Sequence, residues 1–247
     1  TDTVKFEVDT LFDAAGLLDG YKTEIYTPVC EGDKCYAIKI LFRWDILGRY
    51  VSYDTLPGEG LTKLDHIPFT PKDYQKLHGI LADPKSVLAS YQKEELVKDT
   101  RKSEVDGFTG ATVREVRDNV IEGGVYSCYT LWHLAHGRIS ENLRNRTRML
   151  FNEPLVKKLV KTRDQKVFYF LIENFTEQQF EDYIGEVLQT ISYGTGYFPK
   201  NAIEHMPQKA LLVKAAQDFF AEYFDQLGYF TQVALLEKLQ GQKLNEP

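Results

Sequence analysis

Residues 20–42 read GYKTEIYTPVCEGDKCYAIKILF, a stretch with the composition of two strands joined by a short turn. Its two ends, 20–26 and 35–42, are rich in β-branched and aromatic residues, which favour strands. Between them lies a polar loop of hairpin length, residues 31–34. A third strand is predicted at 50–54, and it should end at 56–60 because Pro57 and Gly58 prevent regular strand pairing there.

The composition is that of a globular protein, with 247 residues of which 43% are hydrophobic and 27% charged. These proportions exclude wholesale disorder, collagen and a small disulfide-rich module. The net charge of -6 disfavours an electrostatic hold on nucleic acid or anionic lipid. No run approaches the roughly 18 consecutive apolar residues of a membrane helix. We therefore expect no nucleic-acid partner and no membrane span in this chain.

Helix signals begin at residue 70. Thr70 can cap a helix, Pro71 suits the first helical position, and Asp73 favours the positive end of the helix dipole. This helix should stop near residues 83–84, where a proline follows an aspartate. A second short helix is expected at 86–91.

After Gly137 the pattern becomes almost wholly helical. A capping box is predicted at 176–179, and three apolar faces at helical spacing lie within 180–191, 211–220 and 230–239. We predict an α+β domain over 1–137 and an all-α domain over 138–247. The second domain would consist of stacked helical hairpins of the HEAT type or, alternatively, of a small orthogonal helical domain packed on the first.

One short stretch, residues 105–113 (VDGFTGATV), has the pattern of a phosphate site. Asp106 stands three residues before Thr109, and Gly110 and Ala111 leave room at the backbone before Thr112. A helix is predicted over 113–121, so Thr112 would lie at or just before its N-terminus, where unpaired N–H groups and the helix dipole attract phosphate. Two basic side chains one turn on would add positive charge: Arg114 and Arg117. An ordinary turn and helix cap is the alternative.

These residues resemble the flavinylation motif of the FMN-binding domain family, whose best-known members are subunits of sodium-pumping quinone reductase and of the Rnf electron-transport complex. That motif reads Asp, two variable residues, Ser or Thr, Gly, Ala, Thr. This chain matches all five constrained positions: Asp106, Thr109, Gly110, Ala111 and Thr112. In the family, a dedicated flavin transferase joins the FMN phosphate to the final Thr as a phosphoester. The resemblance therefore implies that Thr112 is the attachment residue and that Asp106 assists the transferase reaction.

The resemblance spans residues 20–135 and implies an FMN-binding-like fold, a small antiparallel sheet with helices. Family members line the flavin with a Thr-Pro-Gly loop, which corresponds here to Thr55, Pro57 and Gly58 with Leu56 inserted. The chain departs from the family in two further respects. Residues 113–115 are Val-Arg-Glu where a further hydroxyl residue is usual, and the membrane-anchoring helix of the family's subunits is missing.

The resemblance implies a periplasmic or otherwise extracytoplasmic flavoprotein that carries covalent FMN and transfers electrons between partners, more than an enzyme that converts a substrate. Its partners would be the flavin transferase and an unidentified redox protein, and protein made without the transferase would lack FMN. The alternative function is a non-enzymatic interaction module whose helical half binds a partner. A hydrolase is disfavoured because the sequence has no matching nucleophile and base.

The three cysteines have different expected roles. Cys30 and Cys35 flank the hairpin loop, and facing positions across a hairpin can satisfy disulfide geometry. A bond there would indicate an exported protein, whereas two reduced cysteines at strand ends are the alternative. Cys128 is poorly spaced to form a metal site with His133 and His136, so we expect packing histidines and a small buried thiol.

Two further groups of residues have a structural and a functional interpretation. Asp65 and His66 either line a pocket beside the flavin or order their own loop by hydrogen bonding. The aromatic clusters at 168–170 and 219–224 have the spacing of core residues, and a partner-binding surface is the alternative.

Overall fold

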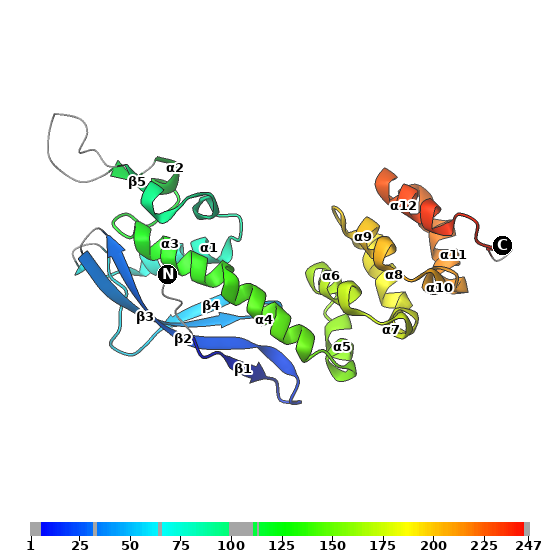
Figure 1. Cartoon of the computed structure of the whole chain (residues 1–247), viewed down its shortest axis with the longest axis horizontal. Helices are drawn as coiled ribbons and strands as arrows, with labels where there is room; N and C mark the ends of the chain where they lie inside the picture. Colours follow the sequence, from blue (N-terminus) through cyan, green and yellow to red (C-terminus); the bar gives the residue numbers. More distant parts are fainter. Residues whose placement is uncertain (1–5, 32–33, 64–65, 99–110, 113, 245–247) are drawn as a thin grey trace. The chain divides into compact units, whose positions relative to one another are not determined.

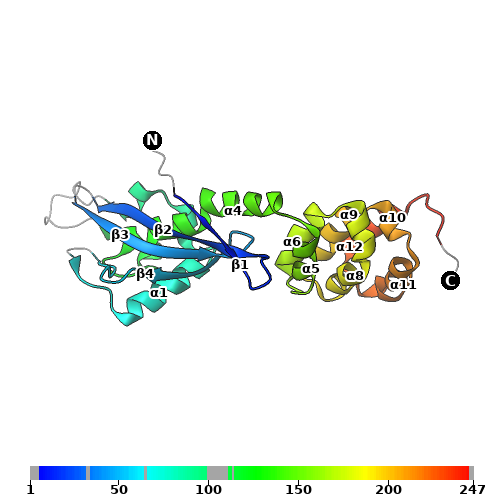
Figure 2. The same cartoon turned by 90° about the horizontal axis from the view of Figure 1, so that it is seen from below.

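The computed structural model describes residues 6–31, 34–63, 66–98, 111–112 and 114–244. The chain forms two compact units, Thr1–Leu150 and Phe151–Pro247 (Figures 1 and 2). The first unit contains an antiparallel sheet with helices and the second is entirely helical, so the predicted α+β fold followed by a helical domain is confirmed. The division between the units falls after Leu150, whereas the sequence placed it after Gly137.

The sheet of unit 1 has four antiparallel strands in the order β1-β2-β3-β4. They are β1 (Asp9–Phe12), β2 (Leu18–Glu31), β3 (Lys34–Trp44) and β4 (Tyr50–Thr55). The last three correspond to the predicted strands, although β2 and β3 are longer than expected and pair as far as Glu31 and Lys34. The short edge strand β1 was not predicted, since four residues with an Asp at the start give little strand signal.

One face of this sheet forms the core of unit 1. Side chains alternate between the two faces of a strand, and the inward set on β2 and β3 is buried: Tyr21, Ile25, Val29, Ile38, Ile40, Phe42 and Trp44. Three helices lie on that side of the sheet (Figure 1): α1 (Pro71–Ala82), α3 (Val125–His136) and α4 (Arg138–Met149). Among the described residues, the opposite face of β2 is largely exposed, as at Glu24, Tyr26 and Pro28, which is usual for an antiparallel sheet.

Helix α4 belongs to unit 1 because buried hydrogen bonds attach it to the sheet. The hydroxyl oxygens of Tyr21 and Thr147 lie 2.7 Å apart, and both side chains are fully buried. Thr147 donates its single hydroxyl proton to the carbonyl of Ile46, so Tyr21 is the donor in the first bond. Ser140 also donates to the carbonyl of Gly48 in the turn between β3 and β4. Gly137 therefore separates two helices of the same unit, and the predicted boundary at that residue is corrected to Leu150.

Removal of the Tyr21 hydroxyl should destabilise unit 1. We expect Tyr21→Phe to lower the free energy of unfolding by about 1–2 kcal/mol, because Thr147 would lose a buried partner. Tyr26→Phe is a matched control, since Tyr26 lies on the same strand but is 61% exposed, and it should change stability little. Both tryptophans, Trp44 and Trp132, are in unit 1, so their fluorescence during urea unfolding reports this unit. Equal losses in the two variants would contradict the assigned role of the hydroxyl.

The capped helix predicted from residue 70 is confirmed as α1. Thr70 and Asp73 form a capping box, and Pro71 is the first helical residue. The helix ends at Ala82, with Asp83 as its C-cap just before a proline, as expected for a residue restricted by the following ring. The expected second helix is a single 3-10 turn, η2 (Val87–Ser90), and a further turn, η3 (Lys93–Glu95), follows it.

Unit 2 is a series of short helices. They are α5 (Glu153–Val160), α6 (Gln165–Asn174), α7 (Glu177–Asp182), α8 (Ile184–Tyr193), α9 (Phe198–His205), α10 (Gln208–Leu211), α11 (Lys214–Tyr223), η5 (Phe224–Gln226) and α12 (Tyr229–Leu239). The predicted capping box at Thr176 and Gln179 starts α7. The apolar face over 180–191 does not belong to one helix, because Tyr183 adopts a non-helical conformation and its hydroxyl donates to Glu153 on α5.

The helices of unit 2 stack with a regular period. Helix α6 contacts α9, α9 contacts α12, and α8 contacts α11. Four hydrogen bonds also join residues that are 30 positions apart: Glu153 with Tyr183, Arg163 with Tyr193, Gln165 with Thr195, and Gln208 with Lys238. The helical hairpins have apolar residues at matching positions but not the same residue types, so the sequence shows no obvious repeat. Such an array of similar helical pairs is typical of helical repeat proteins.

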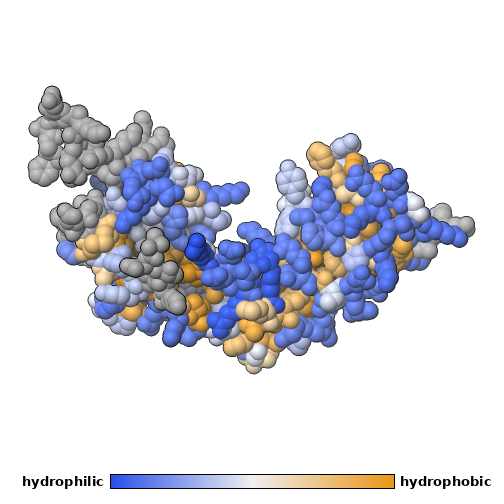
Figure 3. All heavy atoms as spheres, in the orientation of Figure 1, coloured by the Kyte–Doolittle hydropathy of each residue, from blue (hydrophilic) through white to orange (hydrophobic). Residues whose placement is uncertain are grey.

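The aromatic clusters of unit 2 contribute mainly to its core. Phe168, Phe170 and Phe220 are buried, whereas Tyr169 and Phe219 are partly exposed. Hydrophilic residues cover much of each unit on the face shown in Figure 3, with smaller hydrophobic patches between them. Within the described ranges, every helix is too short or too polar to cross a bilayer.

Candidate functional site

The flavinylation-like motif is described only at its end. Ala111 and Thr112 form the two-residue strand β6, which pairs antiparallel with β5 (Val97–Lys98), Thr112 facing Val97. The other three motif positions lie outside the described residues: Asp106, Thr109 and Gly110. Helix α2 (Arg114–Arg117) starts two positions after Thr112. A strand that leads directly into a helix is the context in which a backbone phosphate site of this kind would be expected.

The helix after the motif is shorter than predicted. The expected helix over 113–121 is the single turn α2, followed by a turn in which the amide of Asn119 donates to the carbonyl of Val116. Val120 and Ile121 continue into the core and are buried, and this tertiary packing ends the helix early. One turn sums few peptide dipoles. A phosphate at Thr112 would therefore depend more on individual N–H groups than on a helix dipole.

Helix α2 and the turn that follows it pack against the rest of unit 1. Val116 is fully buried and α2 packs against η2. Lys76 on α1 donates to the backbone carbonyl of Val120. Arg117, one of the two cations expected to assist phosphate binding, has an exposed side chain that pairs with its neighbour Asp118, Nε to Oδ1 3.4 Å. An exposed pair of this kind contributes little to stability.

The residues expected to line the flavin are at the end of β4. Thr55 is the last residue of the strand and pairs with Ile40 on β3. Pro57 and Gly58 occupy the central positions of a β-turn closed by a 2.9 Å bond from the Glu59 amide to the Leu56 carbonyl. Leu56, the residue inserted relative to the family loop, is the first residue of this turn.

An open pocket of about 570 Å³ lies between β4 and α1. It is lined by Tyr53, Asp54, Thr55, Tyr74, Gln75 and His78. Its volume is within the range of small-molecule sites, which is roughly 300–1,000 Å³. Of the three predicted loop residues, only Thr55 lines it. The pocket is formed by β4 and α1 rather than by β6, so the structure does not bring the attachment residue and this loop together in one described cavity.

Hydrogen bonds fix the aromatic side of the pocket. The Tyr53 hydroxyl donates to the backbone carbonyl of Tyr74, and the Tyr50 hydroxyl lies 2.9 Å from Nδ1 of His78. Burial raises the pKa values of Tyr50 and Tyr53 above their usual range, so both remain protonated and neutral at physiological pH. Sequence reasoning missed this cluster because its members come from two elements with no common motif.

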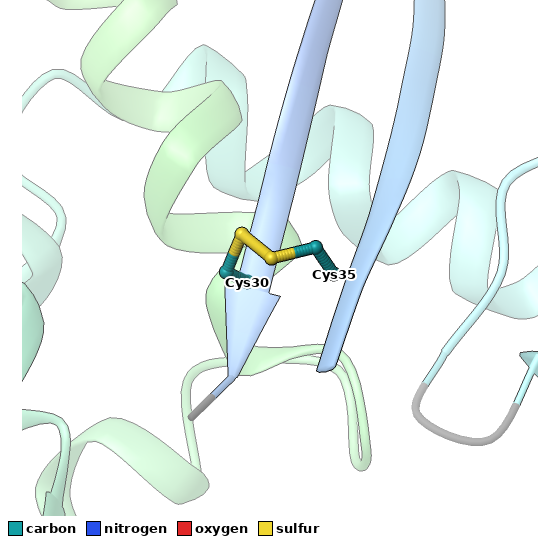
Figure 4. Close-up of a disulfide and its surroundings, with 2 residues drawn as sticks. All are labelled: Cys30 and Cys35. Carbon is teal, nitrogen blue, oxygen red and sulfur yellow. A yellow bond between two sulfur atoms is a disulfide. The ribbon is translucent and has the colours of Figure 1, made fainter. Parts of the chain in front are cut away.

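Cys30 and Cys35 form a disulfide at the end of the hairpin (Figure 4). The two residues face each other directly in the β2–β3 register, with Cα atoms 4.0 Å apart. Because alternate residues share a face, the bridge lies on the face of the sheet opposite to the core. The disulfide that the sequence predicted between these two cysteines is therefore confirmed.

Cys128 is the buried thiol that the sequence predicted. Burial is the main cause that raises its pKa to about 11, so it is neither ionised nor accessible at physiological pH. His133 and His136 pack around Trp132, at ring distances of 5.0 and 4.8 Å. Among the described residues, no three His, Cys, Asp or Glu side chains converge on a possible metal site. Of the pair Asp65 and His66, the first is outside the described residues and the second is exposed beside Tyr36.

These cysteine environments predict a simple thiol count. Protein denatured without reductant should react with a thiol reagent at one cysteine, because two of the three are bonded to each other. The native protein should react at none, since Cys128 is buried and its pKa is raised. Denaturation after reduction gives the control value of three. Three reactive thiols without reductant would contradict the disulfide.

No protein-family model matches this chain, and no match is found among curated proteins or solved structures. The resemblance to the FMN-binding family therefore depends on the motif residues and on their setting in the fold.

Proposed function

We propose that unit 1 carries FMN bound as a phosphoester to Thr112 and that the protein transfers electrons outside the cytoplasm. The observation that supports this proposal is the match of five constrained positions in seven consecutive residues: Asp106, Thr109, Gly110, Ala111 and Thr112. The strand-to-helix setting of Thr112 is compatible with the motif. The Cys30–Cys35 disulfide is compatible with export, since such bonds persist in oxidising compartments.

The chemistry of attachment requires an activated flavin. The Thr112 hydroxyl would supply the oxygen of the new ester and give up its proton to a base. Formation of an ester from free FMN would release water, which is unfavourable in aqueous solution. A flavin dinucleotide balances the reaction: the Thr112 oxygen bonds to the flavin-side phosphorus, the phosphoanhydride bond between the two phosphates breaks, and AMP leaves. When bound, the flavin supplies the redox chemistry, and this chain would supply position and electrostatics.

The residues of this chain would have separate tasks. Thr112 provides the covalent bond, and small neighbours at Gly110 and Ala111 admit the phosphate to the backbone. Asp106 assists the transferase reaction. Thr55, which lines the pocket beside α1, is the residue that the family loop would place against the flavin, although the described residues do not join this pocket to Thr112 in one cavity. The electron donor and acceptor would be redox proteins.

The direct test is the intact mass of the protein made with and without a flavin transferase. With the transferase, the mass should increase by FMN less one water, and flavin absorbance should remain with the protein after denaturation. The same protein made without the transferase is the control and should be unmodified. An unmodified, colourless chain from the transferase-expressing host, alongside a flavinylated known substrate in the same cells, would contradict the proposal.

A second function is a protein-interaction module in unit 2. The supporting observation is a set of aromatic side chains that remain exposed in the loops and helix starts: Tyr197 at 76%, Tyr229 at 71% and Phe230 at 65%. Exposed aromatic residues are common at protein interfaces. A chain without flavin that captures a defined partner, and loses it when Tyr229 and Phe230 are replaced by Ser, would support this function instead.

A further inference from the structure

One side of α3 holds the segment that follows α1. Trp132 donates from its indole nitrogen to the backbone carbonyl of Asp83, at 2.9 Å. Nε2 of His136 lies 2.7 Å from the carbonyl of Leu81, near the end of α1. The next turn, η2, packs on α3, and its Leu88 is fully buried. Trp132 thus attaches the start of residues 83–90 to α3, His136 attaches the end of α1, and Leu88 packs the following turn on the same helix.

His133 lies in one row of ring side chains on α3 with Trp132 and His136, and one of its ring nitrogens has no hydrogen-bond partner among the described residues. Its ring packs against Tyr129 at 4.2 Å and Trp132 at 5.0 Å. Its Nε2 atom is buried without a hydrogen-bond partner among the described residues. Burial lowers the pKa of His133, the backbone of Leu88 partly opposes this, and His136 lowers the pKa further. The neutral ring therefore suits this position, and the charged ring does not.

Several charged and titratable groups lie close to the row. They are Tyr129 and His136 on α3; Lys93, Glu94 and Glu95 on η3; and Asp83 and Lys85 in the turn after α1. Burial raises the pKa of Tyr129, and the two nearby glutamates raise it further. Of all these groups, only His136 changes the pKa of His133 appreciably, and it disfavours protonation.

The sign of the pH effect follows from this arrangement. A histidine whose pKa is lowered in the folded state binds fewer protons there than when its environment is opened. Its stabilising contribution is fully present above the ordinary histidine pKa of about 6.5 and is lost as the pH falls below it. Acid therefore favours whichever state exposes His133 to water.

We propose that residues 83–90 are an acid-released latch: the segment is held on α3 while His133 is neutral, and it separates, together with α2, when His133 takes up a proton. Helix α2 is included because it packs on η2. The latch itself requires no flavin. Thr112 lies two residues before α2, so acid would also loosen the chain that presents Thr112 to the transferase. This consequence rests on the proposed function.

Hydrogen exchange on the full-length protein, made without the transferase, tests the latch. Deuterium uptake is measured by mass spectrometry at about pH 7.5 and about pH 5.5, with rates corrected for the pH dependence of chemical exchange. Peptides covering 83–96 and 114–121 should exchange several-fold faster at the lower pH. Peptides from β2 and β3 should not change. No acceleration in 83–96, or the same acceleration throughout unit 1, would overturn the proposal.

Two histidine variants make the test specific. His133→Phe keeps an aromatic ring of similar size without a titrating group, so the acid response of 83–96 should be lost. His205→Gln is the control, because His205 is an exposed residue in unit 2, and the response should remain. If His133→Phe does not fold, His133→Gln is measured in its place with the same expected loss. A full acid response in a folded His133 variant would overturn the proposal. Because the protein carries no flavin, these outcomes do not depend on the proposed function.

Discussion

Thr112→Val should abolish covalent flavin completely in protein made with the transferase. Valine has the shape of threonine and the same β-branch, which suits strand β6, but it has no oxygen to form the phosphoester. The expected result is an intact mass equal to that of the bare chain and no flavin fluorescence from denatured protein in a gel. Thr112→Ala should give the same result. The loss is all-or-none because no other residue stands at the final position of the motif.

The matched control is Thr55→Val, which removes a hydroxyl from the residue expected to contact the flavin. This variant should keep the added mass, because Thr55 would touch the flavin and not carry its phosphate. Retention of flavin by Thr112→Val would contradict the named attachment residue. Loss of flavin from both variants would show that the effect is not specific to Thr112.

Gly48→Ala should destabilise unit 1 far more than the same change at Gly16. The two glycines end turns with the same hydrogen bonds, in residues 13–17 and 45–49, where an aspartate carboxylate accepts two backbone N–H groups. Both glycines have positive φ, 73° at Gly16 and 71° at Gly48. A Cβ on Gly16 would meet open space, whereas one on Gly48 would overlap the backbone carbonyl of Ser140 on α4.

The two substitutions therefore separate backbone strain from steric overlap. Gly16→Ala should cost about 1 kcal/mol, the penalty for an L-residue in the left-handed region. Gly48→Ala adds displacement of α4 and should cost about 4 kcal/mol or more. Urea unfolding followed by the fluorescence of Trp44 and Trp132 gives both values. Equal losses would mean that α4 does not press on the β3–β4 turn as described.

The features predicted from sequence are those fixed by neighbouring residues. The α1 helix could be predicted because Thr70, Pro71 and Asp73 form its cap within four positions. The β2–β3 hairpin and its disulfide could be predicted because both strands and their loop are consecutive. The boundary between the units could not, because it depends on the bond between Tyr21 and Thr147, which are 126 positions apart.

The candidate site likewise has some features that the sequence predicts and others that it does not. The motif around Thr112 is a local pattern and was visible in the sequence. The helix after it was overestimated because its periodicity continues to Ile121, whereas burial of Val120 and Ile121 in the core bends the chain away. The pocket beside Thr55 was not predicted, since Tyr74 and His78 approach it only through the packing of α1 against β4.

The period of 30 residues in unit 2 has a consequence for how this protein can change in evolution. Helices α6, α9 and α12 contact one another in succession, and a hydrogen bond joins Glu153 on α5 to Tyr183 at the start of α8. Layers that contact only their neighbours can be duplicated or deleted singly without rebuilding the rest. Homologous chains should accordingly differ in length by whole layers of about this size, rather than by scattered insertions within helices.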